Sequence, residues 1–168
     1  MKHILFIAAT LLLITACKKG GTGPAGTANV IYSKWFKPDT YTKDTVFGIW
    51  GFNYIQAAPE ITQQMLDTAT IFTFAKLEGY NPFIWRPGQV GLLPITLTYN
   101  TGVVTRDVWS AGYTVGTIRI RMTNDMNIYP GINTSHQFRY IIIPGGKLTG
   151  RQAPPTYEEV CRRYNIPE

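Results

Sequence analysis

The chain has 168 residues and a formal net charge of +6, and 45% of its residues are hydrophobic. That apolar content excludes an intrinsically disordered chain, and two cysteines are too few for a disulfide-stapled miniprotein. The length favours one domain with a single hydrophobic core.

The first sixteen residues have the pattern of a bacterial lipoprotein signal peptide. Lys2 precedes an apolar run from Ile4 to Ile14, much shorter than the roughly 20 residues that a membrane-spanning helix needs. The run leads into Thr15-Ala16-Cys17, which matches the end of a lipobox, where small residues precede the acylated cysteine. We predict residues 1–16 as the signal peptide and Cys17 as the lipidation site. An ordinary cleaved signal peptide with an incidental cysteine is the alternative.

Lipidation at Cys17 would attach the protein to a membrane, because two or three acyl chains on one residue hold it almost permanently. No aspartate follows Cys17, so the usual retention signal for the inner membrane is absent. The sequence therefore favours the outer membrane, with the leaflet left open. Residues 17–28 contain three Gly-X-Y triplets, too few for a collagen triple helix, and favour a flexible tether over a trimerising stub.

From residue 29 to residue 143, short apolar, β-branched and aromatic runs alternate with Gly, Pro, Asn and Asp. Such runs predict strands, and no alternating strand and helix units interrupt them. The predicted strands are Val30–Phe36, Val46–Ile55, Thr70–Leu77, Gly91–Tyr99, Val103–Trp109, Thr117–Met122 and Phe138–Ile143.

One connection and two of these strands allow more specific predictions. Asn100-Thr101-Gly102 predicts a hairpin loop in which the glycine takes a positive φ. Strict alternation in Thr117–Met122 predicts an antiparallel strand with Ile118, Ile120 and Met122 facing inward and its two arginines facing outward. Tyr140–Ile143 is apolar at every position, which predicts a central strand covered on both faces.

Two helices are predicted. Residues 59–68 contain a short one, and Thr156 begins the second as an N-cap, with Glu159 completing a capping box. The apolar residues of the second helix lie at i, i+3, i+4 and i+7, namely Tyr157, Val160, Cys161 and Tyr164. The predicted fold class is all-β: an antiparallel β-sandwich of Ig-like or jelly-roll kind with a short C-terminal helix, over residues 29–168.

The sequence predicts no catalytic residue, no metal site and no cofactor. His136 lies in a polar loop and is expected to be solvated, and Cys161 on the apolar helix stripe is expected to be a buried small hydrophobe. Asp39, Asp44, Asp67, Asp107 and Asp125 stand beside turns or strand ends, where solvation or capping explains them.

The candidate ligand-binding residues are aromatic and basic. Trp85 lies in Asn81–Gly88, which reads as an exposed loop, so it is the leading candidate for contact with a ligand. Arg119 and Arg121, together with Arg139, are candidates for a basic strip, with a plain solvated face as the alternative. Nucleic acid is not expected as a partner.

Several segments across the chain match a known pattern: the lipobox at Cys17, residues 23–33 with Trp35, and residues 58–63, 138–146 and 157–161. Through these segments the chain resembles a family of Gram-negative lipoproteins without an assigned activity, some of which have collagen-like stalks. The resemblance implies an exported lipoprotein with a β-rich domain and supplies no catalytic residues. The expected function is a non-enzymatic interaction or structural module of the cell envelope. A carbohydrate-binding module is the alternative, so the partner beyond the membrane is a glycan or another envelope protein.

Overall fold

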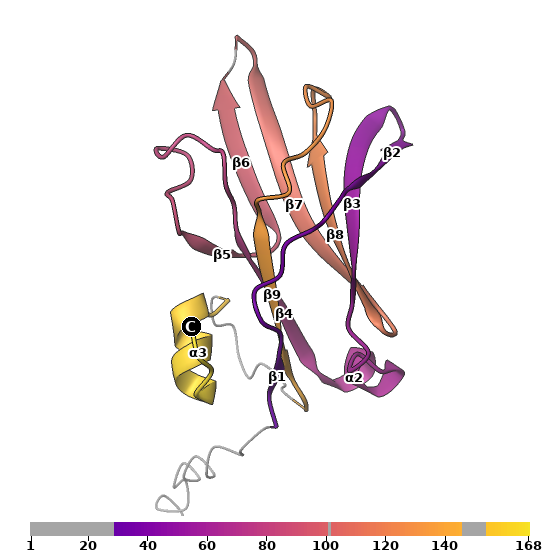
Figure 1. The fold of residues 1–168 in the computed structure, drawn as a ribbon, viewed down its shortest axis with the longest axis vertical. Helices are drawn as coiled ribbons and strands as arrows, with labels where there is room; N and C mark the ends of the chain where they lie inside the picture. Colours follow the sequence, from indigo (N-terminus) through magenta and orange to yellow (C-terminus); the bar gives the residue numbers. More distant parts are fainter. Residues whose placement is uncertain (1–28, 101, 146–153) are drawn as a thin grey trace, which may run out of the picture.

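The computed structural model describes residues 29–100, 102–145 and 154–168, which form an antiparallel β-sandwich with two short helices (Figure 1). One sheet has the strand order β1-β9-β4-β5 and the other β2-β3-β8-β7-β6. The predicted fold class is confirmed, whereas residues 1–28, including Cys17, lie outside the described residues. The elements are β1 Ile31–Tyr32, β2 Thr42–Val46, β3 Ile49–Ala57, α2 Gln63–Thr68, β4 Thr70–Lys76, β5 Val90–Leu92, β6 Ile95–Asn100, β7 Val104–Thr114, β8 Thr117–Asn124, β9 Gln137–Ile143 and α3 Tyr157–Tyr164.

The five-stranded sheet turns one face to the core and the other to solvent. On β8, Ile118, Ile120 and Met122 are at most 1% exposed, while Arg119 and Arg121 lie on the opposite face. This alternation was predicted, and it follows from the period of two along a strand. The core between the sheets therefore receives every second residue of β8.

Strand β9 is central to the other sheet, as predicted, because it pairs with β1 on one side and β4 on the other. Tyr140 and Ile142 belong to the core between the two sheets. Ile141 and Ile143 belong to a second core, in which they pack with buried residues of α3. The helix thus covers the outer face of the four-stranded sheet (Figure 1).

Helix α3 begins at the predicted capping box. The Thr156 hydroxyl accepts a hydrogen bond from the Glu159 amide, and the Glu159 carboxylate accepts one from the Thr156 amide. Tyr157, Val160 and Cys161 are buried, so Cys161 is the buried hydrophobe that the sequence predicted.

Two predicted strands are each split in the structure. The run Val46–Ile55 contains the β2–β3 turn, where Phe47 and Gly48 have φ of 48° and 81°. The run Gly91–Tyr99 divides into β5 and β6, which belong to different sheets. Leu93 and Pro94 separate the two strands, and Pro94 interrupts the pairing because proline has no amide hydrogen to donate to a neighbouring strand.

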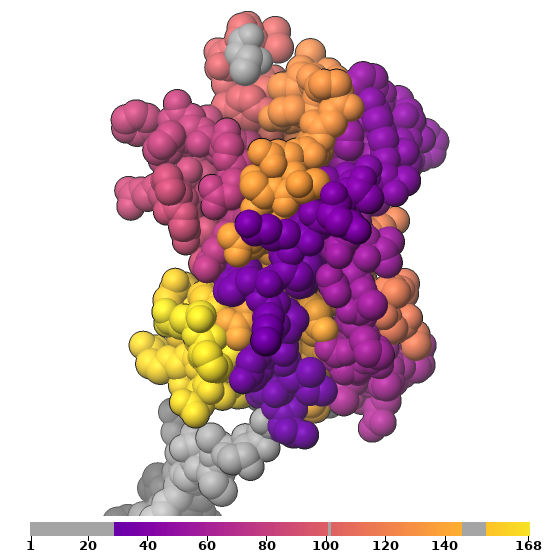
Figure 2. Space-filling view, viewed as in Figure 1, coloured from indigo at the N-terminus to yellow at the C-terminus, as the bar shows by residue number. Residues whose placement is uncertain are grey.

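The sandwich has two different ends. Strand β1, the first described strand, lies at the same end as α2, and three connections lie at the other end, which we call the far end (Figure 1). These are the β2–β3 turn, the β6–β7 hairpin and the β8–β9 loop, residues 125–136. In the space-filling view, the orange β8–β9 loop covers the upper part of the molecule between the purple and the magenta segments (Figure 2).

Candidate functional site

A cavity of about 270 Å³ opens at the far end between the two sheets. Its most deeply buried lining residues, Trp109 and Met122, are 0% and 1% exposed, whereas Asn133 is exposed to solvent. The cavity therefore runs from the core to the surface. It is lined by Glu78, Gly79, Tyr80, Trp109, Met122, Tyr129, Gly131, Ile132, Asn133 and His136.

Behind the cavity lies Asp107, an aspartate with 0% exposure. The hydroxyls of Tyr80 and Tyr129 each donate to its Oδ2 atom at 2.8 Å, and the side-chain Nδ2 of Asn124 donates to Oδ1 at 2.6 Å. The Tyr99 hydroxyl lies 3.1 Å from both carboxylate oxygens and also contacts the Tyr129 hydroxyl. The carboxylate is satisfied by neutral donors, so its negative charge is stabilised but not neutralised.

The expectation that solvation or capping explains Asp107 is therefore wrong. Asp107 shares the inward face of β7 with Trp109, and the period of two places it inside. Within the described ranges the single ion pair joins Arg121 to Asp44, on the outer face of the sheet. Asp107 thus leaves an unpaired negative charge beneath the cavity.

The tyrosines of this cluster are held in their neutral, donating form. Burial, chiefly, raises the pKa of Tyr80 and that of Tyr129 far above the ordinary value for a phenol, and the Asp107 carboxylate raises them further. The Tyr80 hydroxyl also accepts a hydrogen bond from Trp109 Nε1 at 2.8 Å. Two of the aromatic rings that line the cavity are therefore fixed through one chain of hydrogen bonds.

His136 is the second departure from expectation, because the sequence predicted a solvated loop residue and the side chain is 4% exposed. Its Nδ1 atom accepts a hydrogen bond from the Glu78 backbone amide at 3.0 Å. Its ring packs edge-on against that of Trp109, with the ring centroids 4.6 Å apart. Burial lowers the pKa of His136 to about 4, so the imidazole is neutral at neutral pH. It adds an aromatic wall to the cavity and no positive charge.

The loop that carries Tyr129 is fixed by asparagines. Asn124 Oδ1 accepts hydrogen bonds from the amides of Met126 and Ile128. Asn127, with a φ of 54°, accepts from the Trp50 amide at 2.8 Å and donates to the Gly48 carbonyl at 2.7 Å. The β8–β9 loop is thereby joined to the β2–β3 turn, which keeps Tyr129 over Asp107.

Trp85, the leading ligand candidate from the sequence, is not exposed. It is 6% exposed and belongs to the core between the sheets, where its Nε1 atom has no hydrogen-bond partner. The amides of Ile84 and Trp85 both donate to the Asn81 carbonyl, and this tight turn directs the indole inward while Phe83 is 102% exposed. A Cβ on Gly91 would lie 2.5 Å from the indole, so a glycine there makes room for it.

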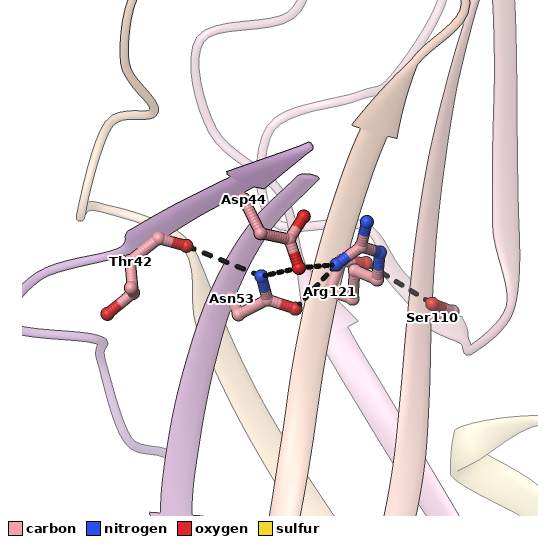
Figure 3. A network of polar contacts seen from close by, with 5 residues as sticks. All are labelled: Thr42, Asp44, Asn53, Ser110 and Arg121. Atoms are coloured by element: carbon pink, nitrogen blue, oxygen red, sulfur yellow. Dashed lines mark hydrogen bonds and ion pairs between the residues drawn. The ribbon is translucent and has the colours of Figure 1, made fainter. Parts of the chain in front are cut away.

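The predicted basic strip is also not formed. Arg121 donates to Asp44 at 2.5 Å and to Asn53 at 2.9 Å, and Asn53 donates to Asp44 at 3.0 Å (Figure 3). This network occupies the guanidinium of Arg121 with side chains of β2 and β3. Arg119 is exposed on the same face and stands beside this network rather than within it.

Arg139 belongs to the other sheet and is 4% exposed beneath α3. It donates to the Ser33 carbonyl, the Tyr157 hydroxyl and the Pro167 carbonyl. Its role is to join the two ends of the described chain to β9, so it cannot extend a surface strip with Arg119 and Arg121.

Three further findings concern the class of protein. Among residues 29–100, 102–145 and 154–168, no group of three or more His, Cys, Asp or Glu side chains is placed to hold a metal ion. None of the helices in this part of the chain has the length and apolarity to cross a bilayer. Comparison with protein-family models, with curated proteins and with solved structures gave no match to this chain.

Proposed function

We propose that this chain is an outer-membrane-anchored lipoprotein whose β-sandwich is a non-enzymatic binding module, with the far-end cavity as its binding site. The observation that carries the proposal is the position of the cavity. It is lined by the β8–β9 loop at the end of the sandwich away from β1, so an anchor joined to the chain ahead of β1 would leave the cavity free for a ligand. The lipobox and the resemblance to Gram-negative lipoproteins support the anchor.

The far end also carries exposed apolar side chains on its turns and loops. Phe47 is 103% exposed, and Met126 and Ile128 are 50% and 43% exposed. Apolar side chains gathered at one end of a domain are typical of interaction surfaces rather than of ordinary solvated loops. They support an interaction role for the same end of the molecule.

The binding site can be tested through the methionine methyl groups. The sequence has four methionines, of which Met122 lines the cavity, while Met65 lies in α2 at the other end and packs against the core. In the full chain labelled with ¹³C at these methyls, a small-molecule extract of the envelope should shift the Met122 signal and leave Met65 unchanged. If extracts from several growth conditions never shift Met122, the cavity is not a binding site.

The anchor is tested separately, by labelling with palmitate and by fractionation. We expect Cys17→Ala to lose both the label and the membrane association, whereas the matched variant Cys161→Ala retains both, because Cys161 is buried in α3. An unlabelled wild-type chain would refute lipidation.

A carbohydrate-binding module is the second candidate. The rings of Tyr80 and Tyr129 in the lining favour it, because such rings stack on sugar faces. Trp85 no longer supports it, since that indole is buried. A glycan array in which Tyr129→Leu leaves every signal unchanged would remove this candidate.

A further inference from the structure

We propose that the far-end cavity binds a small organic cation, with an alkylated or protonated ammonium group seated against its aromatic walls. This inference rests on the proposed function and names the ligand class of the same cavity. Tyr80, Trp109, Tyr129 and His136 supply four aromatic side chains from β7 and two different loops. Aromatic side chains around one cavity favour a cation, because Tyr and Trp rings present negative charge on their faces.

The charge around the cavity favours the same ligand class. Glu78 lines it, and Asp107 lies directly behind Tyr80 and Tyr129, held by neutral donors. Among the described residues that line it there is no lysine or arginine. Two carboxyl groups close to an aromatic pocket, with no lysine or arginine among its described lining residues, favour a cation there, and a partly buried site screens that attraction less than open water does.

The polar groups of the lining argue against a ligand recognised mainly through hydroxyl groups. The Tyr80 and Tyr129 hydroxyls already bind Asp107, and His136 Nδ1 already accepts from the Glu78 amide. A sugar needs several free partners for its hydroxyls, because unpaired polar groups are costly to bury. An ammonium group with alkyl substituents needs aromatic faces and a nearby carboxylate, and the lining supplies both in Tyr80, Tyr129 and Glu78.

The volume limits the size of the ligand. About 270 Å³ lies just below the roughly 300–1,000 Å³ that drug-sized ligands occupy. A choline-sized headgroup fits that space, and an oligosaccharide chain does not. The cation can be a free amine or the headgroup of a lipid, since both present the same chemistry to the walls.

The test uses the full chain in a polyoxyethylene detergent, which contains neither sugar nor ammonium groups. Choline is titrated by calorimetry and by the Met122 methyl signal, alongside its neutral isostere 3,3-dimethyl-1-butanol. We expect choline to bind about tenfold more tightly than the isostere, because only the charged ligand gains the cation–π and carboxylate attraction. Phosphocholine in a third titration separates the sources: binding as tight as that of choline assigns a lipid headgroup, and weaker binding assigns a free amine.

Two variants and a matched control sharpen the result. Glu78→Gln should weaken choline binding about three- to tenfold and leave the isostere unchanged, and Tyr129→Leu should weaken choline at least as much. Asp67→Asn removes one exposed negative charge from α2 at the opposite end and should change neither affinity. The Met65 signal reports whether each variant is folded, and Glu78 is only partly buried, so its substitution spares the core.

The outcomes separate the two proposals. Choline that fails to bind, or that binds no more tightly than its isostere, overturns the cation as the ligand class. If Met122 nevertheless shifts with an envelope extract, the binding function stands with a different ligand class. If neither choline nor any extract shifts Met122, both proposals fall together.

Discussion

Acidification should destabilise this protein through the buried imidazole of His136. The side chain is 4% exposed, its Nδ1 accepts from the Glu78 amide, and its ring lies against Trp109. Burial lowers its pKa from 6.5 to about 4. Protonation therefore places a charge on a side chain that is almost completely shielded from water, and the folded state resists that proton more than the unfolded state does.

The magnitude follows from the two pKa values. Above pH 6.5 both states are neutral and the full stability is present. Between pH 6.5 and 4 the unfolded state holds one proton more than the folded state, so the free energy of unfolding falls by about 1.4 kcal/mol per pH unit as the pH drops. Between pH 7.5 and 4.5 the free energy of unfolding therefore falls by about 2 to 3 kcal/mol. The pKa values of Asp44 and Asp125 are lowered by hydrogen bonds, so their contributions are lost only at lower pH, below 3.8.

The assay compares wild type with His136→Asn by urea unfolding of the full chain, followed by far-UV circular dichroism at several pH values. Asparagine can place its Oδ1 atom where Nδ1 accepts from the Glu78 amide, and it does not titrate. The wild-type curve should decline by about 2 to 3 kcal/mol relative to the variant between pH 7.5 and 4.5. If the free energies of unfolding of wild type and His136→Asn change equally with pH over this window, burial does not lower the pKa of His136.

Three further predictions concern stability in urea. Asp107→Ala should lower the free energy of unfolding by at least about 3 kcal/mol, because it leaves several buried hydroxyl and amide donors without their acceptor. A decrease below about 1 kcal/mol would contradict the stabilising role of this network. Thr156→Ala should cost about 1 kcal/mol through the lost cap of α3, and an unchanged urea midpoint would show that the helix is held by packing alone. Gly51→Ala should lower the free energy of unfolding by up to about 1 kcal/mol. The added Cβ would lie 2.1 Å from the Arg121 guanidinium and would displace that group from its ion pair with Asp44. Gly112→Ala is its matched control: the nearest atom is 3.9 Å away, so it should be neutral, and equal costs at the two glycines would remove the steric explanation.

The fold could be predicted because it depends on local periodicity. Alternation placed Ile118 and Ile120 inside, the apolar run at the end of β9 placed that strand at the centre of its sheet, and Thr156 with Glu159 marked the start of α3. Each of these signals lies within a few neighbouring residues. The strand boundaries failed where the chain turns within an apolar run, as at Phe47 and Gly48, because a hairpin turn can be made from residues that also suit a strand.

The site could not be predicted in the same way, because its residues come from segments that only the tertiary structure brings together. Part of the signal was present: Asp107 and Trp109 have the same parity on β7, so a buried Trp109 implies a buried Asp107. The same reasoning requires partners for a buried carboxylate, and tyrosine hydroxyls are the neutral donors that this tyrosine-rich chain has in supply. Which tyrosines serve depends on topology, because Tyr80 follows β4, Tyr99 lies on β6 and Tyr129 is in the β8–β9 loop. The prediction of an exposed Trp85 was wrong because a single backbone turn at Asn81 decides whether Phe83 or Trp85 faces solvent. Composition does not distinguish the two residues.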